Sequence, residues 1–315
     1  LEVAACGVCR SDYHGWVGGH PKVTPGSILG HEYCGTVVEV GPRATYSIGD
    51  KLIAPFILGC GSCGACQMGA SNTCESAIVP GFGTPGAYAE FVAVPFDHNL
   101  VHLPENMSPA LAAGLGCRVT TDWHALTDRA NLRAGEWVAV HGTGGIGLSA
   151  LLLAKMLGAR VVVVDVVKEK LAHARHLGAD AAVNALQGDV AAKIHDITSG
   201  GAQVSIEALG HEITTNASVE CLANLGRHVH VDMPSGDGMM HINMRAIYAK
   251  QLAFFGTRGM PAWKYPLLLS MIERGDVDLS PMLDREISLS AASAELRAMS
   301  GPKPPGTAVT TAFSR

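Results

Sequence analysis

Apolar and polar positions alternate on two length scales in the middle of the chain. Short apolar runs, largely β-branched, predict strands at 137–141, 160–165, 181–184, 203–208, 226–232 and 252–255. Longer stretches between them predict helices at 146–157, 168–177, 190–198 and 213–223. Gly158 and Gly178 lie just past two of these helices, where a left-handed cap favours glycine. Continuous apolar strands separated by helices predict a doubly wound parallel sheet with helices on both faces.

The two ends of the chain show a different pattern. The first part is rich in Gly, Pro and Cys, and short runs at 35–40 and 51–54 predict strands of a mainly β unit. Near the C-terminus the pattern predicts helices at 265–274 and 291–299, followed by a Pro-rich loop at 301–306. We therefore expect an α/β protein with three segments, namely 1–118, 119–255 and 256–315.

Composition narrows the class of protein. The chain has 315 residues, of which 48 % are hydrophobic and 16 % charged, enough for about two globular domains. The net charge is −5 and no basic run is present, which argues against nucleic acid and membrane partners. No apolar stretch approaches the roughly 18 to 20 residues that span a bilayer. The chain begins at Leu1, not at Met, in the middle of a pattern, so further sequence, including a targeting segment, could precede it.

A glycine-rich motif follows the first strand of the predicted sheet. Residues 141–147 read His-Gly-Thr-Gly-Gly-Ile-Gly and contain G-x-G-x-x-G between a strand and a helix, the context that favours dinucleotide binding over an ordinary turn. Gly142 permits the tight turn, Gly144 with Gly145 lets the backbone approach a pyrophosphate, and Gly147 allows close packing on the sheet. Asp165 ends the second strand, where a carboxylate can accept hydrogen bonds from ribose hydroxyls and repel a 2′-phosphate. This favours NAD over NADP.

Four of the nine cysteines crowd into one short stretch, residues 60–74. They are Cys60, Cys63, Cys66 and Cys74, with glycines between them. This spacing favours one tetrahedral Zn²⁺ whose four positions are all filled by protein, so we interpret it as structural. An iron–sulfur cluster is the main alternative, and paired disulfides are a further one. Cysteines used for metal indicate a reducing compartment, and we expect the protein to be cytoplasmic.

Three distant residues could form a second, open metal site. Cys9, His31 and Cys117 together would offer one imidazole and two thiolates and leave a fourth position for water or an alcohol. Spacing alone does not select these three, because each could equally be a buried core residue.

Together these residues resemble the zinc-containing medium-chain alcohol dehydrogenases. The segments 9–12, 30–32 and 60–74, Cys117 and the loop 142–147 match that family in order over nearly the whole chain. The resemblance implies a GroES-like catalytic domain over 1–118, a Rossmann NAD-binding domain over 119–255 and a return to the catalytic domain over 256–315. It also implies two Zn²⁺ per chain, NAD, a homodimer or homotetramer, and hydride transfer between an alcohol and NAD with an aldehyde or ketone as product.

The same resemblance assigns catalytic roles. Cys9, His31 and Cys117 would bind the catalytic zinc, with Glu32 behind the metal and Asp12 hydrogen-bonded to the outer nitrogen of His31. The alcohol would take the open position, where the metal lowers the pKa of its hydroxyl. Ser11 would accept that proton and His14 would pass it to water. A surface His14 without a role is the alternative.

Cofactor and substrate contacts follow in the same way. Arg10 matches a pyrophosphate contact and Lys170 a contact to the adenosine ribose. Thr121 and Ile146 match positions that pack against the nicotinamide. Trp16 and Phe56 match pocket positions and would suit small or slender alcohols, although either could be plain core.

The chain departs from the family at both ends. The family has about thirty further residues before the point that matches Leu1, including strands of the catalytic domain. Residues 306–309 lack the arginine that many relatives carry for the cofactor phosphates, so cofactor affinity should depend more on Arg10 and the helix dipole. Three other functions remain open: a polyol or amino-alcohol dehydrogenase of the same superfamily, a non-catalytic sensor of NAD and zinc, and a zinc-free quinone reductase.

Overall fold

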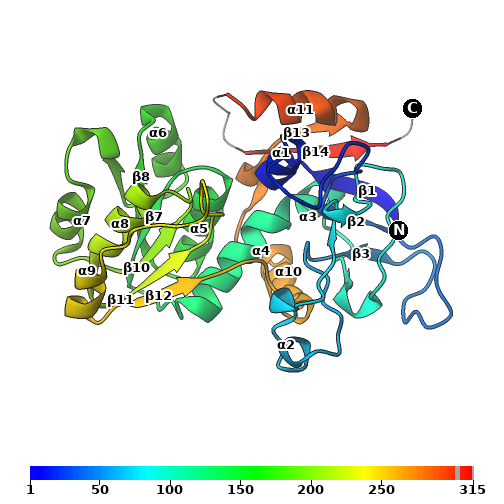
Figure 1. The fold of residues 1–315 in the computed structure, drawn as a ribbon, viewed down its shortest axis with the longest axis horizontal. Helices are drawn as coiled ribbons and strands as arrows, with labels where there is room; N and C mark the ends of the chain where they lie inside the picture. Colours follow the sequence, from blue (N-terminus) through cyan, green and yellow to red (C-terminus); the bar gives the residue numbers. More distant parts are fainter. Residues whose placement is uncertain (302–305, 314–315) are drawn as a thin grey trace. The chain divides into compact units, whose positions relative to one another are not determined.

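The computed structural model describes residues 1–301 and 306–313 (Figure 1). They form two compact units. The first unit is Leu1–Thr120 with Gly259–Arg315, and the second unit is Thr121–Arg258. No helix among the described residues is both long and apolar enough to cross a membrane.

A six-stranded parallel sheet forms the centre of the second unit. Its strand order is β12-β11-β10-β7-β8-β9, and every adjacent pair is parallel. The strands are β7 (Trp137–His141), β8 (Arg160–Asp165), β9 (Ala181–Asn184), β10 (Ala202–Glu207), β11 (Leu222–His230) and β12 (Ala253–Gly256). Val161, Val162 and Val163 are completely buried, as expected of a strand covered on both faces. The parallel doubly wound sheet is therefore confirmed.

Helices connect these strands. They are α5 (Gly145–Met156), α6 (Lys168–His176), α7 (Val190–Thr198), α8 (Glu212–Glu220) and α9 (Met244–Lys250), with a short 3-10 turn, η4 (Ala185–Gln187). The two glycines expected at helix ends have positive φ, +80° at Gly158 and +103° at Gly178. Their lack of a Cβ explains why α5 and α6 end where they do.

The predicted boundary between helix 213–223 and strand 226–232 is wrong. Helix α8 ends at Glu220, and β11 already begins at Leu222. The strand register jumps between the pairs Ala202–Leu222 and Val204–Arg227, so the intervening residues bulge out of the ladder. Leu225 lies in this bulge with φ +61° and a largely exposed side chain, and such a bulge breaks the apolar periodicity.

The first unit contains a mixed six-stranded sheet with the order β13-β14-β1-β2-β3-β6. Its strands are β1 (Glu2–Gly7), β2 (Glu32–Thr36), β3 (Lys51–Ile53), β6 (Val101–His102), β13 (Leu283–Ser288) and β14 (Thr307–Ala312). Strand β14 pairs antiparallel with β1 and parallel with β13, so the C-terminal segment completes the sheet that the N-terminal strand begins. The short strands β4 (Val79–Pro80) and β5 (Gly83–Thr84) pair with each other in parallel and form a separate two-stranded sheet.

Helices of the first unit are short. They are α1 (Arg10–Trp16), α2 (Gly64–Gln67), α3 (Pro109–Leu115), α10 (Tyr265–Glu273) and α11 (Ala292–Ala298), and α4 (Cys117–His124) crosses the boundary between the units. Single turns lie at η1 (Ser71–Thr73), η2 (Asp97–Asn99), η5 (Ala262–Lys264), η6 (Ser280–Met282) and η7 (Leu289–Ala291), and the π-helical turn η3 (Ala125–Arg129) follows α4. The two predicted C-terminal helices thus correspond to α10 and α11. The loop predicted at 301–306 lies largely outside the described residues.

The strand predicted at 35–40 is displaced. Strand β2 begins at Glu32 and ends at Thr36. Val37 still bonds to the residues just before β3, since its N–H donates to the carbonyl of Asp50 and its carbonyl accepts from Gly49, and the pairing ends there. Val38 and Val40 are consequently exposed, although their β-branched side chains predict a strand.

Candidate functional site: two metal-binding groups and a phosphate loop

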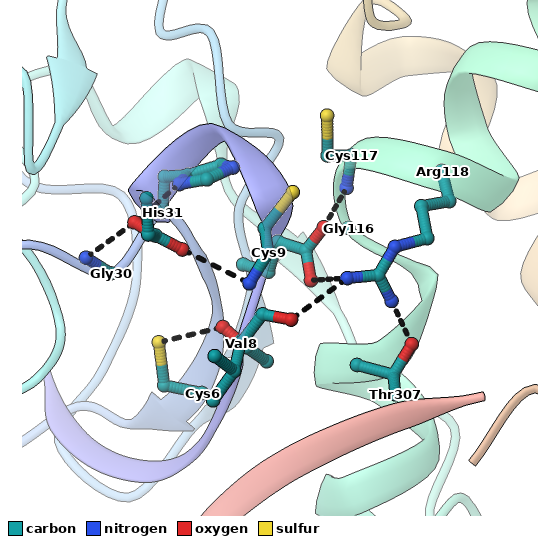
Figure 2. A network of polar contacts seen from close by, with 12 residues as sticks. Cys6, Val8, Cys9, Gly30, His31, Gly116, Cys117, Arg118 and Thr307 are labelled. Carbon is teal, nitrogen blue, oxygen red and sulfur yellow. Dashed lines mark hydrogen bonds and ion pairs between the residues drawn. The ribbon is translucent and has the colours of Figure 1, made fainter. Parts of the chain in front are cut away.

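Three segments of the first unit bring Cys9, His31 and Cys117 together; we call these residues the three-ligand cluster. Cys9 precedes α1, His31 precedes β2 and Cys117 begins α4. Their candidate ligand atoms, with a carboxylate oxygen of Glu32, all lie within 4.8 Å of one another. Figure 2 shows how these side chains converge from separate elements. The arrangement matches the donor set that zinc prefers, one imidazole and two thiolates.

Asp12 organises the cluster from within α1. Its side chain is completely buried, and both oxygens are used. Oδ1 accepts from His31 Nδ1 at 3.0 Å and from the N–H of Gly30 at 3.1 Å. Oδ2 accepts from the N–H of Cys9 at 3.1 Å and from the Tyr88 hydroxyl at 3.0 Å. One carboxylate therefore holds the backbone before two of the candidate ligands and also fixes the imidazole.

The outer face of His31 fits a metal ion. Its ring is buried, and Nδ1 donates to Asp12, which leaves Nε2 as the acceptor nitrogen. Nε2 has no hydrogen-bond partner in the described part of the chain. A buried nitrogen without a partner is costly unless something binds it. The Cys9 thiol has a pKa well below its usual value, because its interactions with nearby Cys117 and His31 outweigh the effect of burial. A thiolate and a free imidazole nitrogen are what zinc binding requires.

Glu32 and Arg118 form a buried pair behind the cluster. The Glu32 carboxylate accepts from the N–H of Cys117 at 3.0 Å, and it lies 3.7 Å from the Arg118 guanidinium. Burial raises the pKa of Glu32 to about 8, although Arg118 opposes this shift. Arg118 also donates to the carbonyl of Val8 at 2.9 Å and to the hydroxyl of Thr307 (Figure 2). The sequence analysis did not identify Arg118, since a lone arginine after Cys117 carries no recognisable motif.

Aromatic rings surround His31 on one side. Phe56 is buried, with its ring centroid 5.8 Å from that of His31, and Phe82 lies 5.4 Å from it on edge. Sequence reasoning selected Phe56 but missed Phe82. Trp16 is 46 % exposed on α1, so the plain-core alternative does not apply to it.

The remaining predicted residues of α1 are Arg10, Ser11 and His14. Ser11 and His14 are three residues apart, a spacing that places side chains on one face of a helix. Arg10 is exposed, with its guanidinium 6.0 Å from the Tyr13 ring.

The four-cysteine lobe, residues 60–74, forms the second candidate metal site. The four sulfurs all lie within 4.8 Å of one another, in the group Cys60, Cys63, Cys66 and Cys74. None of the nine cysteines forms a disulfide, so the disulfide alternative is wrong. Buried Asn99 holds Gly59, the residue just before the lobe. Its side chain accepts from the N–H of Gly59 at 2.9 Å and donates to the Gly59 carbonyl at 3.0 Å. Trp263 donates its indole N–H to the carbonyl of Gly69 at 2.8 Å.

The glycine loop of the second unit lies between β7 and α5. Gly142 has φ +96°, and Gly144 directly precedes the helix, with Gly145 and Ile146 in its first turn. A Cβ on Gly147 would meet the carbonyl oxygen of Gly142 at 1.8 Å, so only glycine allows α5 to start this close to the loop. The free N–H groups of the first turn of α5 are available to a phosphate.

Asp165 ends β8 and reaches back to this loop. Its Oδ2 accepts from the N–H of Thr143 at 2.9 Å and from the Thr143 hydroxyl at 2.6 Å. Its Oδ1 accepts from the N–H groups of Val166 and Val167 at 2.8 and 3.0 Å. Burial alone would raise the pKa of Asp165, but the Thr143 hydrogen bonds and the charge of Lys170 bring it below its usual value. Thr121, also predicted to contact the cofactor, is buried on α4 at the start of the second unit.

Comparisons with known proteins agree with this combination of sites. Residues 1–105 match the alcohol dehydrogenase GroES-like domain, and residues 145–274 match the zinc-binding dehydrogenase domain. An alcohol dehydrogenase of Geobacillus stearothermophilus is 35 % identical over 240 residues, which cover 75 % of this chain and 70 % of the relative. The chain belongs to the zinc-containing medium-chain dehydrogenase/reductase family.

Other members of the family differ in substrate. A D-arabitol-phosphate dehydrogenase of Enterococcus avium is 28 % identical over 299 residues, covering 92 % of this chain and 83 % of the relative. A solved structure described as an NAD-dependent alcohol dehydrogenase has a TM-score of 0.89 and 27 % identity, covering 99 % of this chain and 90 % of that one. The chain is therefore an oxidoreductase of the alcohol dehydrogenase family, and its substrate must be argued from its own residues.

Proposed function

We propose that this protein is a zinc-dependent, NAD-linked alcohol dehydrogenase that transfers hydride between an alcohol carbon and the nicotinamide. The observation that carries the proposal is the three-ligand cluster, in which the ligand atoms converge and buried His31 Nε2 has no hydrogen-bond partner among the described residues. Cys9, His31 and Cys117 would hold the catalytic zinc, and the four cysteines of the lobe a structural zinc, two per chain. When bound, the catalytic zinc acts as a Lewis acid that lowers the pKa of an alcohol hydroxyl.

The protein residues around the cluster have separate tasks. Asp12 keeps the proton of His31 on Nδ1 and so directs Nε2 toward the metal. Glu32 stands behind Cys117, where its carboxylate can assist ligand exchange. Ser11 accepts the substrate proton and His14, on the same face of α1, passes it toward water.

Cofactor binding falls to the glycine loop and its surroundings. The N–H groups around Gly144, Gly145, Ile146 and Gly147 would bind the pyrophosphate with the help of the helix dipole. Asp165 and Lys170 would face the adenosine ribose, and the negative charge of Asp165 favours NAD over NADP. Arg10 would add a pyrophosphate contact and Thr121 would pack against the nicotinamide.

Two substrate classes deserve testing. Phe56 and Phe82 beside His31 favour a small or slender alcohol, because aromatic walls leave little room for polar groups. The similarity to a D-arabitol-phosphate dehydrogenase makes a polyol the second candidate.

The test is a panel of primary alcohols, secondary alcohols, polyols and polyol phosphates, assayed with NAD by nicotinamide absorbance. Cys9→Ser should lose turnover in this panel, whereas Cys221→Ser, which alters a buried thiol of the second unit, should retain it. If the parent oxidises none of these substrates, or if Cys9→Ser remains active, the proposal is wrong.

A further inference from the structure

The side chain of Thr143 stands out in the phosphate loop because its neighbours have none. In the run Gly142–Gly145, threonine is the one residue that can reach out of the loop. Its side chain is 1 % exposed, and its hydroxyl bonds to Asp165 at 2.6 Å. The backbone N–H of the same residue bonds to the same carboxylate oxygen at 2.9 Å. Two bonds to one oxygen fix the position of Thr143 and the orientation of its peptide group.

Asp165 is in turn held rigidly. Besides the pair from Thr143, it accepts from the N–H groups of Val166 and Val167. An ionised carboxylate offers about four lone-pair sites, and four protein donors occupy them. A ribose hydroxyl can therefore bond to Asp165 only by sharing a site. Asp165 therefore has a structural task in the loop besides the ribose contact proposed above.

The geometry of the loop explains why the hydrogen bonds between Thr143 and Asp165 are needed. At its start, the N–H of Gly142 bonds to the carbonyl of Val164 at 2.8 Å. At its end, Gly147 packs so closely on Gly142 that a methyl group would not fit. Between these points the glycines provide no side-chain contacts, and glycine has the greatest backbone freedom. Thr143 supplies the missing anchor at the middle of the loop.

We propose that Thr143 is a positioning residue that, through Asp165, holds the phosphate-binding turn in its binding-competent shape. This inference rests on the proposed function, because it takes the loop to be the binding site of the cofactor pyrophosphate. Loss of the Thr143 hydroxyl then weakens binding of the phosphates themselves, whether or not a ribose hydroxyl is present. A glycine at position 165 removes both bonds to Thr143, so it weakens phosphate binding in addition to its effect on the ribose contact.

The experiment compares ADP with 2′,3′-dideoxy-ADP, which has the same phosphates but neither ribose hydroxyl. Their dissociation constants are measured by displacement of NADH fluorescence from the zinc-loaded protein. Thr143→Val keeps the shape of the side chain but removes the donor, and we expect it to weaken both nucleotides by the same factor, about tenfold. Thr143→Ser restores the hydroxyl and should return both constants to within about twofold of the parent.

The outcomes separate the inference from the proposed function. A parent that binds neither NADH nor ADP contradicts the proposed function itself. The inference is overturned if Thr143→Val weakens ADP but leaves dideoxy-ADP unchanged, since Thr143 would then act on ribose recognition. It is also overturned if the parent binds ADP but not dideoxy-ADP, or if Thr143→Ser behaves like Thr143→Val. Urea unfolding of each variant serves as the control for a general loss of stability. Such a loss would not explain recovery of binding in Thr143→Ser alone.

Discussion

Two completely buried histidines should make the second unit sensitive to acid. His141 ends β7 with Nε2 at 3.6 Å from Cys221 Sγ, and it is 1 % exposed. His228 lies in β11 with Nδ1 at 3.2 and 3.1 Å from the hydroxyls of Ser205 and Ser218. Burial lowers the pKa of each imidazole from 6.5 to about 3. Both rings are therefore neutral in the folded protein at any pH above about 3.

The sign and size of the effect follow from proton linkage. Below pH 6.5 the unfolded chain binds protons at these rings while the folded chain does not, so stability falls as the pH falls. Each pH unit below 6.5 costs about 1.36 kcal/mol per group until the folded pKa is reached. Between pH 7 and pH 5 each histidine should thus lower the free energy of unfolding by about 2 kcal/mol.

Urea unfolding at pH 7 and pH 5, followed by circular dichroism, measures this loss. His228→Asn keeps an acceptor for the serine hydroxyls but does not titrate in this range, so its loss between the two pH values should be smaller by about 2 kcal/mol. His176→Gln is the matched control, since His176 is exposed at the end of α6. Acid release of metal affects parent and variants alike and cancels in the comparison. Equal losses in the parent and in His228→Asn would refute the reasoning.

Three other predictions concern the metal sites and the loop. Metal analysis should find two zinc ions per chain in the parent and one in Cys66→Ser; a parent with one or none would contradict the assignment. Cys9→Ser should retain NADH fluorescence binding and overall fold by circular dichroism while losing turnover, because the cluster lies outside the second unit; loss of NADH binding would argue against this separation. Gly147→Ala should lower stability by about 1–3 kcal/mol, because the methyl group would overlap the Gly142 carbonyl. Gly144→Ala, with φ −80° and open space at its Cβ, should leave thermal stability nearly unchanged, and equal melting temperatures for the two variants would count against this argument.

The parallel sheet could be predicted from the sequence because its signals are local. Runs such as 160–165 are continuously apolar, and glycines mark the helix ends at 158 and 178. The sequence of the first unit contains weaker signals of secondary structure. Strands β1 and β14 pair with each other although they lie near opposite ends of the sequence. Neither strand is long or regular enough to be recognised alone. Val38 and Val40 predict a strand, but β2 ends before them and both side chains are exposed.

The two candidate metal sites also differ in how well the sequence alone predicts them. The four-cysteine lobe is one short segment whose spacing already predicts a metal. The three-ligand cluster depends on contacts between distant segments. Only the resemblance to a family predicts its members from sequence, and the structure brings them together. Tyr88 and Arg118 could not be predicted in this way, because their importance lies in contacts with distant residues, among them Asp12 and Glu32, that no spacing encodes.

The two candidate metal sites also differ in how far the protein shapes them without a metal. Around the three-ligand cluster, Asp12 joins the segments of Cys9 and His31, and Arg118 joins the carbonyl of Val8 to β14 and to Glu32. Asp12, Glu32 and Arg118 are buried, so breaking one of these contacts would leave a buried polar or charged group with fewer partners. The cluster is therefore preorganised, which suits a site that must keep its geometry while substrate enters and leaves.

The four-cysteine lobe has no comparable support. Its helix α2 contains no buried residue, and three of its four cysteines are partly exposed. Asn99 and Trp263 hold the lobe at Gly59 and at Gly69, but within residues 60–74 only Asn72 and Cys74 are buried. With so little apolar burial, we expect metal–thiolate bonds to supply much of the free energy that orders this segment. The three-ligand cluster is thus held in place by protein contacts, whereas the four-cysteine lobe should depend on bound metal for its order.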